Sequence, residues 1–485
     1  MIVRRSFAAV WRTLNFDPAL TPYYLLLKLW SVPSTSEVWL RLPSVVAMAT
    51  AVTATALLAT RSSGRRGGLM TALVMLLLTA TTRYGQEARP YALSTLFVVL
   101  AVLCWEDDRL VTSRWQQARL AAVLALAGAA HPYALLVLPV LLVASRVLPA
   151  SDRRRVGATA TSGSVALLVL SPWLVLVAQR AKGIPNAPPV NPVNIAEEAL
   201  RLPVGVLSPR LAPAFAVAVL GLAAAGLVLA WRREGFSRDL ALLAGLWLCI
   251  PPLCLCIFQM ATGSPGLLTR YWLLCLPALA LAAGCALDLL WTRGRAAAVV
   301  CAVVLCGLAF PTQLSLRGED GHSGERWRHV DELLALPALR DAPLLTIGGG
   351  YRAVVSNHPQ FVARMPLVLD PVASGRVNPR LARPGSDVFR TLTRDHDVIV
   401  ALQPEPDSFA GIPTRRAFTA FPRELRFFPG DAVHCSYFGE PLGIFMSSSS
   451  ALGLVEAETL AQQIMAVAPG QVQCAVRISP RSQVS

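Results

Sequence analysis

The sequence predicts an α-helical polytopic membrane protein that carries a mixed α/β domain at its C-terminal end. Two observations carry this prediction. Apolar residues make up 54% of the chain and charged residues 15%, which is unlike a soluble protein of 485 residues. Runs of about 20 apolar residues, long enough to cross a bilayer, follow one another up to Pro311 and then stop. We therefore divide the chain into a juxtamembrane segment (1–41), a transmembrane body (42–312) and a C-terminal domain (313–485).

The N-terminal segment up to Arg41 favours an amphipathic helix at the membrane surface. Tyr23, Tyr24, Trp30 and Trp39 are residues that prefer the interface between lipid and water. The segment contains no convincing secretory signal, because its longest apolar stretch is interrupted by a lysine.

About ten transmembrane helices follow, three of which are short enough to be tilted or broken within the bundle. They are predicted at Leu42–Thr60, Gly68–Thr82, Ala88–Trp105, Ala118–Ala130, Pro132–Val147, Val156–Ala178, Leu211–Trp231, Leu240–Ala261, Tyr271–Trp291 and Ala296–Pro311.

The loops between these helices differ in charge and thereby predict an orientation. Arginine-bearing loops alternate with loops that are richer in Pro, Gly and Asn. Cytoplasmic loops carry an excess of Lys and Arg, so the arginine-rich set is expected inside. This places the loop at Arg83–Glu87, the segment before Leu42 and everything after Pro311 outside the cytoplasm. We expect a multi-pass cell-membrane protein of the cell envelope.

The C-terminal domain is expected to combine helices with strands. A polar helix is predicted at Gly324–Leu336, strands at Leu344–Ile347 and Val398–Leu402, and a helix at Val455–Val467.

The cysteines and the positive charge point to no zinc site and no nucleic acid. Eight of ten cysteines lie in or beside apolar runs, where a thiol packs as a small apolar group. The other two, Cys435 and Cys474, could form a disulfide if their domain is extracytoplasmic. The formal charge of +15 comes largely from short arginine clusters between apolar runs, so it encodes topology and predicts no nucleic-acid partner.

The most informative stretch is TRYGQEARPYAL, residues 82–93, which brings Arg83, Gln86, Glu87 and Arg89 into an external loop. Ionisable residues near hydrocarbon are costly and tend to be paired or functional. One interpretation is an ion pair of Glu87 with an arginine that anchors a helix end. The other is an anion site, in which arginines grip a phosphate and Glu87 orients them.

This stretch, together with Asp17-Pro18, TPYYLLL (21–27), EVWLRLPS (37–44) and Arg270-Tyr271, resembles the GT-C superfamily of polytopic glycosyltransferases. The similarity is greatest to bacterial protein-mannosyltransferase-like enzymes of glycosyltransferase family 39. It covers roughly residues 17–290 and leaves the C-terminal domain without a counterpart. The resemblance implies a helical membrane body, an extracytoplasmic active site and a polyprenyl-phosphate sugar as donor.

The resemblance also implies an acidic pair after a first membrane helix, one carboxylate of which activates the acceptor hydroxyl. Here both the helix and the pair would fall before Met1, so we expect either an upstream start or loss of the base. Asp17 is the best remaining candidate for a catalytic or metal-binding role, with a divalent metal left open. An Asp before Pro is equally common in turns.

Further candidates for binding the phosphate or the sugar lie on the same predicted side of the membrane. They are Arg83, Gln86, Glu87, Arg89, Tyr91, His131, Lys182, Arg270 and Tyr271. Lys182 has the simpler interpretation of a side chain that reaches the membrane interface, and His131 that of a polar turn residue.

The sequence thus predicts a hexosyltransferase, with mannose or a similar sugar moved from a polyprenyl phosphate to a protein, lipid or glycan acceptor outside the cytoplasm. A transporter or lipid flippase is the alternative from another class, because intramembrane charges also occur there. A non-catalytic relative of the enzyme is a third reading.

Overall fold

The fold was examined in a computed structural model of the whole chain. The structure describes residues 6–11, 18–148, 153–180, 188–205, 211–232 and 236–317, together with residues 344–346, 398–402, 432–437, 440–446, 459, 462, 463 and 472–477. The contacts divide it into two units, residues 13–318 and residues 1–12 with 319–485, and we treat each by itself. Residues 13–41, predicted as a juxtamembrane segment, thus belong to the same unit as the membrane helices.

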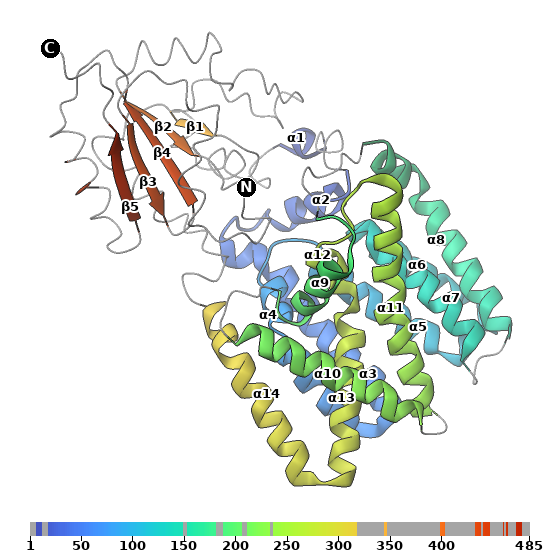
Figure 1. The fold of residues 1–485 in the computed structure, drawn as a ribbon. Coiled ribbons are helices and arrows are strands. Elements are labelled where there is room, and N and C mark those ends of the chain that lie inside the picture. Colours follow the sequence, from blue (N-terminus) through green and yellow to red (C-terminus); the bar gives the residue numbers. More distant parts are fainter. Residues whose placement is uncertain are drawn as a thin grey trace, which may run out of the picture. The chain divides into compact units, whose positions relative to one another are not determined.

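The described residues of the membrane body form helices and the turns that join them (Figure 1). In chain order they are α2 (Thr21–Trp30), α3 (Glu37–Leu77), α4 (Thr79–Gly85), α5 (Tyr91–Glu106), η3 (Asp108–Leu110), α6 (Arg114–Ala130), η4 (Pro132–Leu136), α7 (Val137–Val147), α8 (Arg153–Arg180), α9 (Pro192–Val204), α10 (Ala212–Trp231), α11 (Phe236–Thr262), α12 (Thr269–Trp272), η5 (Leu273–Cys275), α13 (Leu276–Arg293) and α14 (Arg295–Ser315). A short helix α1 (Phe7–Trp11) belongs to the other unit.

Six helical segments are long and apolar enough to cross a bilayer, which makes the chain a multi-pass membrane protein. They are Glu37–Leu77, Arg154–Gln179, Ala212–Trp231, Arg238–Thr262, Thr269–Arg293 and Arg295–Ser315, with the shorter apolar helices Tyr91–Glu106 and Pro132–Val147 beside them.

Helix α3 contains the first predicted span and most of the second, because the chain reverses within it. Gly64 has φ +71°, which glycine adopts without the steric penalty of a side chain. A Cβ on Gly68 would collide with Thr60 and with the carbonyl of Ala56. Gly68 follows Thr60 by eight residues and Ala56 by twelve, and residues so separated would not touch in one straight helix. The segment after Gly64 therefore packs back against the segment before it.

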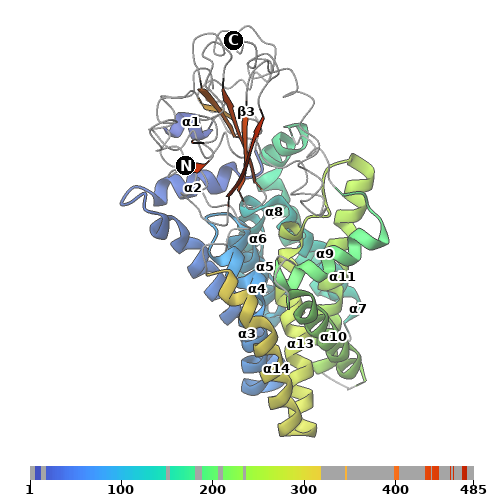
Figure 2. The same ribbon diagram turned by 60° about the vertical axis from the view of Figure 1, so that its left-hand side comes forward.

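Helix α13 is the centre of the body. The apolar window of the segment Thr269–Arg293, which contains α13, is 89% buried, against 22% for the segments in α8 and α14, so the latter two leave most of their surface for lipid. Helix α13 packs against α3, α10, α11 and α14, and Figures 1 and 2 show it between α3, α10 and α14. Small residues allow this close approach: a Cβ on Gly226 of α10 would overlap the backbone of α13.

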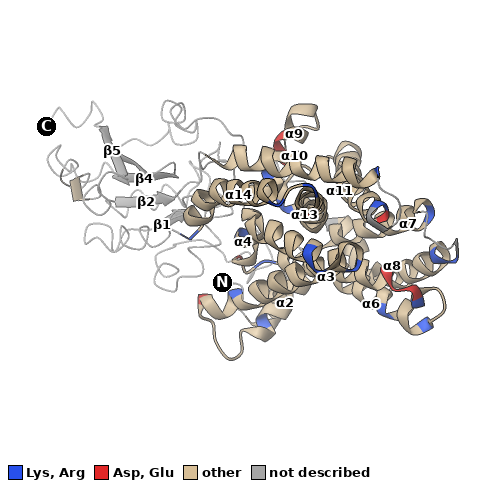
Figure 3. Cartoon of the chain, turned by 90° about the horizontal axis from the view of Figure 1, so that it is seen from below, with Lys and Arg blue, Asp and Glu red and all other residues tan. Residues whose placement is uncertain are grey.

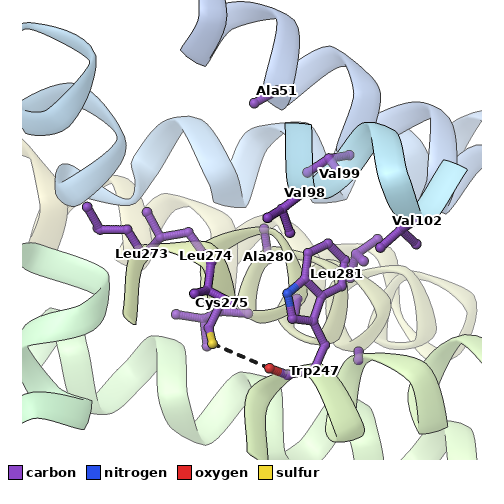
Figure 4. Packing of buried hydrophobic residues seen from close by; sticks show 14 of the residues in the cluster. Ala51, Val98, Val99, Val102, Trp247, Leu273, Leu274, Cys275, Ala280 and Leu281 are labelled. Carbon is purple, nitrogen blue, oxygen red and sulfur yellow. Dashed lines mark hydrogen bonds between the residues drawn. The ribbon is translucent and has the colours of Figure 1, made fainter. Parts of the chain in front are cut away.

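The core next to the site joins α3, α5, α11, η5 and α13. Figure 4 shows Val98, Val99 and Val102 of α5 facing Leu281 of α13 and Trp247 of α11. The thiol of Cys275 donates to the backbone oxygen of Trp247 at 3.3 Å. A buried free cysteine commonly packs in this way, as a small apolar side chain with one weak hydrogen-bond donor.

Ion pairs gather several arginine-bearing loops at one end of the body, which we call the arginine-rich end. Arg61 pairs with Glu106 at 3.5 Å, and Arg155 pairs with Asp108 at 2.9 Å. Arg66, after the reversal in α3, pairs with Asp288 near the end of α13. In Figure 3 the helices are mostly tan, with the charged residues in small patches.

The C-terminal unit contains a five-stranded sheet in the order β1-β2-β4-β3-β5. The strands are β1 (Leu344–Thr346), β2 (Val398–Leu402), β3 (Ala432–Tyr437), β4 (Glu440–Met446) and β5 (Val472–Arg477). β1 and β2 pair in parallel and the other neighbours are antiparallel. The first two strands coincide with those predicted, and the predicted helix at 324–336 lies outside the described residues. The register places Cys435 opposite Cys474.

Candidate functional site

The site lies where the turn between α4 and α5 meets α9, α12 and the turn before η4. The turn 83–90 begins at Arg83, in the last turn of α4, and ends where Pro90 starts α5. The hydroxyl of buried Ser44, on α3, donates to the backbone oxygen of Arg89 at 3.3 Å. A neighbouring helix therefore holds the turn in place.

Glu87 is shared between the two arginines of this turn. Its carboxylate lies 3.6 Å from Nε of Arg83 and 3.7 Å from Nε of Arg89. The ion pair predicted as the simpler interpretation is thus present, but one carboxylate faces two guanidinium groups. Gln86 lies half-buried in the same turn.

Arg270 brings a third guanidinium to the site from α12. Arg83, Arg89 and Arg270 all lie close enough to the Tyr84 ring to affect its pKa, which burial raises to about 12. The Nε of Arg270 is buried and has no hydrogen-bond partner among the described residues, and Arg270 forms no ion pair within this part of the chain. A buried guanidinium donor without an acceptor is costly. The arrangement leaves positive charge and donors available to an anion.

Next to Arg270 is a small pocket whose lining includes four aromatic rings. It is lined by Tyr91, Ser94, His131, Tyr133, Ala134, Arg270, Tyr271, Leu273 and Leu274. The His131 ring lies 5.8 Å from the Tyr91 ring and 5.4 Å from the Tyr271 ring, measured between centroids. The Tyr133 and Tyr271 rings meet edge to face at 4.8 Å. These rings come from three parts of the chain that are distant in sequence, namely α5, the turn into η4, and α12.

His131 is neutral and its tautomer is set by the turn that it caps. Its Nδ1 accepts from the backbone N–H of Tyr133 at 3.3 Å, so the ring proton sits on Nε2. Burial, with Arg270 nearby, lowers the pKa of His131 to about 3. The imidazole can therefore donate a hydrogen bond in the pocket without adding charge.

Helix α9 connects two of the arginine-bearing elements. At its C-terminal end the backbone oxygen of Gly205 accepts from Arg83 at 2.9 Å, and that of Val204 accepts from Thr79 at 3.0 Å. Nearer its start, Glu198 accepts a 2.6 Å hydrogen bond from the hydroxyl of Thr269, the residue before Arg270.

Glu198 is a site residue that the sequence prediction missed. Its side chain is only 5% exposed, and Arg201 lies 3.5 Å away. Burial raises the pKa of Glu198, while Thr269 and Arg201 oppose that rise. The available signal was the pair Glu197-Glu198 on an amphipathic helix that follows a Pro-rich loop.

The N-terminal helix α2 also contributes to the site. Tyr23 is buried and Tyr24 lies near enough to Arg89 to interact with it electrostatically. The rings of Trp30 and Trp39 stack at 4.8 Å, and each indole N–H donates to the backbone oxygen of the other residue. These bonds fix α2 against the start of α3.

Of the candidates predicted from the sequence, eight lie in this region: Arg83, Gln86, Glu87, Arg89, Tyr91, His131, Arg270 and Tyr271. Asp17 and Lys182 lie outside the described residues. Within the described residues no group of three His, Cys, Asp or Glu side chains could hold a metal ion.

Comparison with known proteins gives a match in structure and none in sequence. No family model matches the chain, and no curated protein matches it either. ArnT from Cupriavidus metallidurans in the apo state aligns with a TM-score of 0.53 at 15% identity, over 90% of this chain and 88% of ArnT. ArnT bound to undecaprenyl phosphate aligns with a TM-score of 0.53 at 16% identity, over 91% of this chain and 89% of ArnT. The chain therefore has the fold of ArnT.

Proposed function

We propose that this protein is a membrane glycosyltransferase that moves a sugar, mannose or a similar hexose, from a polyprenyl phosphate to an acceptor outside the cytoplasm. The observation that carries the proposal is the convergence of Arg83, Arg89 and Arg270 near Tyr84, where one carboxylate, that of Glu87, pairs with the first two, beside an aromatic pocket. ArnT, which has the same fold, is known with undecaprenyl phosphate bound.

The arginines match what the leaving group of this reaction requires. An acceptor hydroxyl attacks the anomeric carbon, and the bond from that carbon to the phosphate oxygen breaks, so the phosphate departs with the electron pair. Guanidinium groups stabilise the charge that accumulates on it. Arg270, which has a buried unpaired Nε, and Arg89, which is more exposed, supply donors to the phosphate.

The hydroxyl proton must pass to a base. We assign this role to Asp17, which the family resemblance suggests and which lies outside the described residues. A divalent metal at Asp17 belongs to the same hypothesis.

The proposed orientation follows from the two ends of the body. The arginine-rich end, with Arg61, Arg66 and Arg155, would face the cytoplasm under the positive-inside rule. The three-arginine site would then face the outside, where the C-terminal domain would also lie. The acceptor would be a protein, lipid or glycan of the cell envelope.

The full chain in lipid nanodiscs, incubated with undecaprenyl phosphate mannose labelled in the sugar, tests the activity. Release or transfer of the label is expected, and Arg89→Ala should abolish it, whereas Arg41→Ala, which removes an exposed arginine paired with Glu37, should not. Unchanged turnover by Arg89→Ala contradicts the assignment. Uptake of the donor into proteoliposomes without transfer would identify a transporter instead.

A further inference from the structure

A buried glutamine holds the segment that leads into Arg270. Gln259 lies near the end of the membrane helix α11, and its side chain is buried. Its Oε1 accepts hydrogen bonds from the backbone N–H groups of Gly266 at 2.6 Å and Leu267 at 2.8 Å. A polar side chain buried in an apolar helix is costly unless it is hydrogen-bonded, and such residues are often functional.

The same side chain also fixes the segment that leads into α9. Nε2 of Gln259 donates to the backbone oxygen of Pro188 at 2.6 Å, shortly before α9 begins at Pro192. Helix α9 carries Glu198, which accepts a 2.6 Å hydrogen bond from the hydroxyl of Thr269. The contacts therefore form a closed ring, which runs from α11 through the segment before α12 to α9 and back to α11.

Arg270 depends on this ring for its orientation. Helix α12 is four residues long, too short to hold its own direction through internal hydrogen bonds. At its end the indole N–H of Trp272 donates to the backbone oxygen of Gly266 at 3.2 Å. A Cβ on Gly266 would lie 2.2 Å from the backbone oxygen of Leu255, so this segment packs directly on α11. The segment that Gln259 holds is thus the support of α12.

We propose that Gln259 is a positioning residue for Arg270, which keeps the guanidinium in place before the phosphate of a polyprenyl-phosphate ligand arrives. The inference rests on the proposed function, because it takes Arg270 as a phosphate ligand. A donor that is already held in place loses less freedom on binding, so the affinity is higher. Both polar atoms of the Gln259 side chain are hydrogen-bonded to backbone, so it acts through Arg270 and not by contact with the ligand.

Equilibrium binding of fluorescent undecaprenyl phosphate to the full chain in nanodiscs tests this. Gln259→Leu removes the hydrogen bonds and keeps a side chain of similar size. It should weaken binding by about tenfold, since misplacing a group by about 1 Å can cost on the order of a hundredfold. Gln116→Leu is the matched control, because Gln116 is also 7% exposed but lies in the first turn of α6, which follows η3 at the arginine-rich end. Equal affinities of the two variants overturn the inference.

The same substitution in the Arg270→Gln background separates positioning from a general structural role. Gln259→Leu should weaken binding no further once the guanidinium is gone, because the two changes act through one contact. A second loss of about tenfold in that background overturns the inference. Undecaprenol, which lacks the phosphate, should bind the wild type and Gln259→Leu equally, and a matching loss for undecaprenol overturns the inference as well.

Gln259→Asn keeps the test decisive if the leucine variant does not fold. Asparagine retains a donor and an acceptor but is one methylene shorter, so it should weaken phosphate binding in the same direction, and only while Arg270 is present. Wild-type affinity of Gln259→Asn would then overturn the inference. Failure of the wild-type protein to bind undecaprenyl phosphate contradicts the proposed function instead, whereas tight binding that is indifferent to Gln259 contradicts this inference alone.

Discussion

Replacing Arg270 with Gln should weaken the binding of undecaprenyl phosphate strongly. The substitution removes the guanidinium but keeps a polar side chain of moderate length. Arg270 contributes a buried donor with no hydrogen-bond partner among the described residues, which a phosphate oxygen would satisfy. Hydrogen bonds to charged groups contribute about 1.5 to 3 kcal/mol, so the affinity should fall by roughly 10- to 150-fold.

The substitution of Arg270 should leave the thermal stability of the protein nearly unchanged. Arg270 forms no ion pair with a described residue, so its removal leaves none of the described carboxylates unpaired. The thermal midpoint of Arg270→Gln should therefore stay close to that of the wild type, and the loss of affinity can be read as loss of a ligand contact.

The assay is equilibrium binding of fluorescent undecaprenyl phosphate in nanodiscs, with undecaprenol, which lacks the phosphate, as the ligand control. Arg41→Gln is the matched protein control, because Arg41 is an exposed arginine whose partner, Glu37, lies on the same helix. The reasoning is refuted if Arg270→Gln binds undecaprenyl phosphate as tightly as Arg41→Gln does. Equal weakening for undecaprenol would also refute it, since the effect would then not depend on the phosphate.

Three further predictions concern packing, α9 and the C-terminal sheet. Gly226→Ala should destabilise the body by about 1 to 3 kcal/mol in thermal unfolding, because the added methyl group meets the backbone of α13, whereas Gly221→Ala in the same helix has open space and should be neutral. Glu198→Ala should lower the free energy of unfolding by about 1 to 3 kcal/mol, because it leaves the buried hydroxyl of Thr269 without an acceptor. Glu197→Ala, at the half-exposed neighbouring position, should have little effect. Cys435 and Cys474 are register partners on the antiparallel strands β3 and β5, and Cα atoms of such pairs lie about 4.5 to 5.5 Å apart, within the range of a disulfide. Mass spectrometry of the unreduced, alkylated protein should find these two cysteines linked, and two alkylated thiols would contradict that.

The turn at residues 83–89 could be predicted from sequence because charged residues stand out against apolar surroundings. The same contrast revealed the reversal in α3, where Gly64 sits in an arginine-bearing loop between two apolar runs. Glu198 could not be found in this way. Two consecutive glutamates on an amphipathic helix have the pattern of a solvated face, and only the contact with Thr269 distinguishes the buried one from its neighbour.

The aromatic pocket was predicted only in part, for a related reason. Tyr91, His131 and Tyr271 were each noticed beside other polar residues, but Tyr133 and Ser94 are ordinary residues of apolar helices in sequence terms. Their meeting depends on how α5, η4 and α12 pack, and no local pattern records that packing.

The position of α9 has a consequence for how such a protein could diversify. This one helix contacts Arg83 through Gly205 and the residue before Arg270 through Glu198. A substitution in α9 that shifts it by a fraction of an ångström would re-aim two guanidinium groups while leaving every pocket residue unchanged. Variation between homologues in this helix would therefore be a route to new donor preferences that an inspection of the pocket residues alone would overlook.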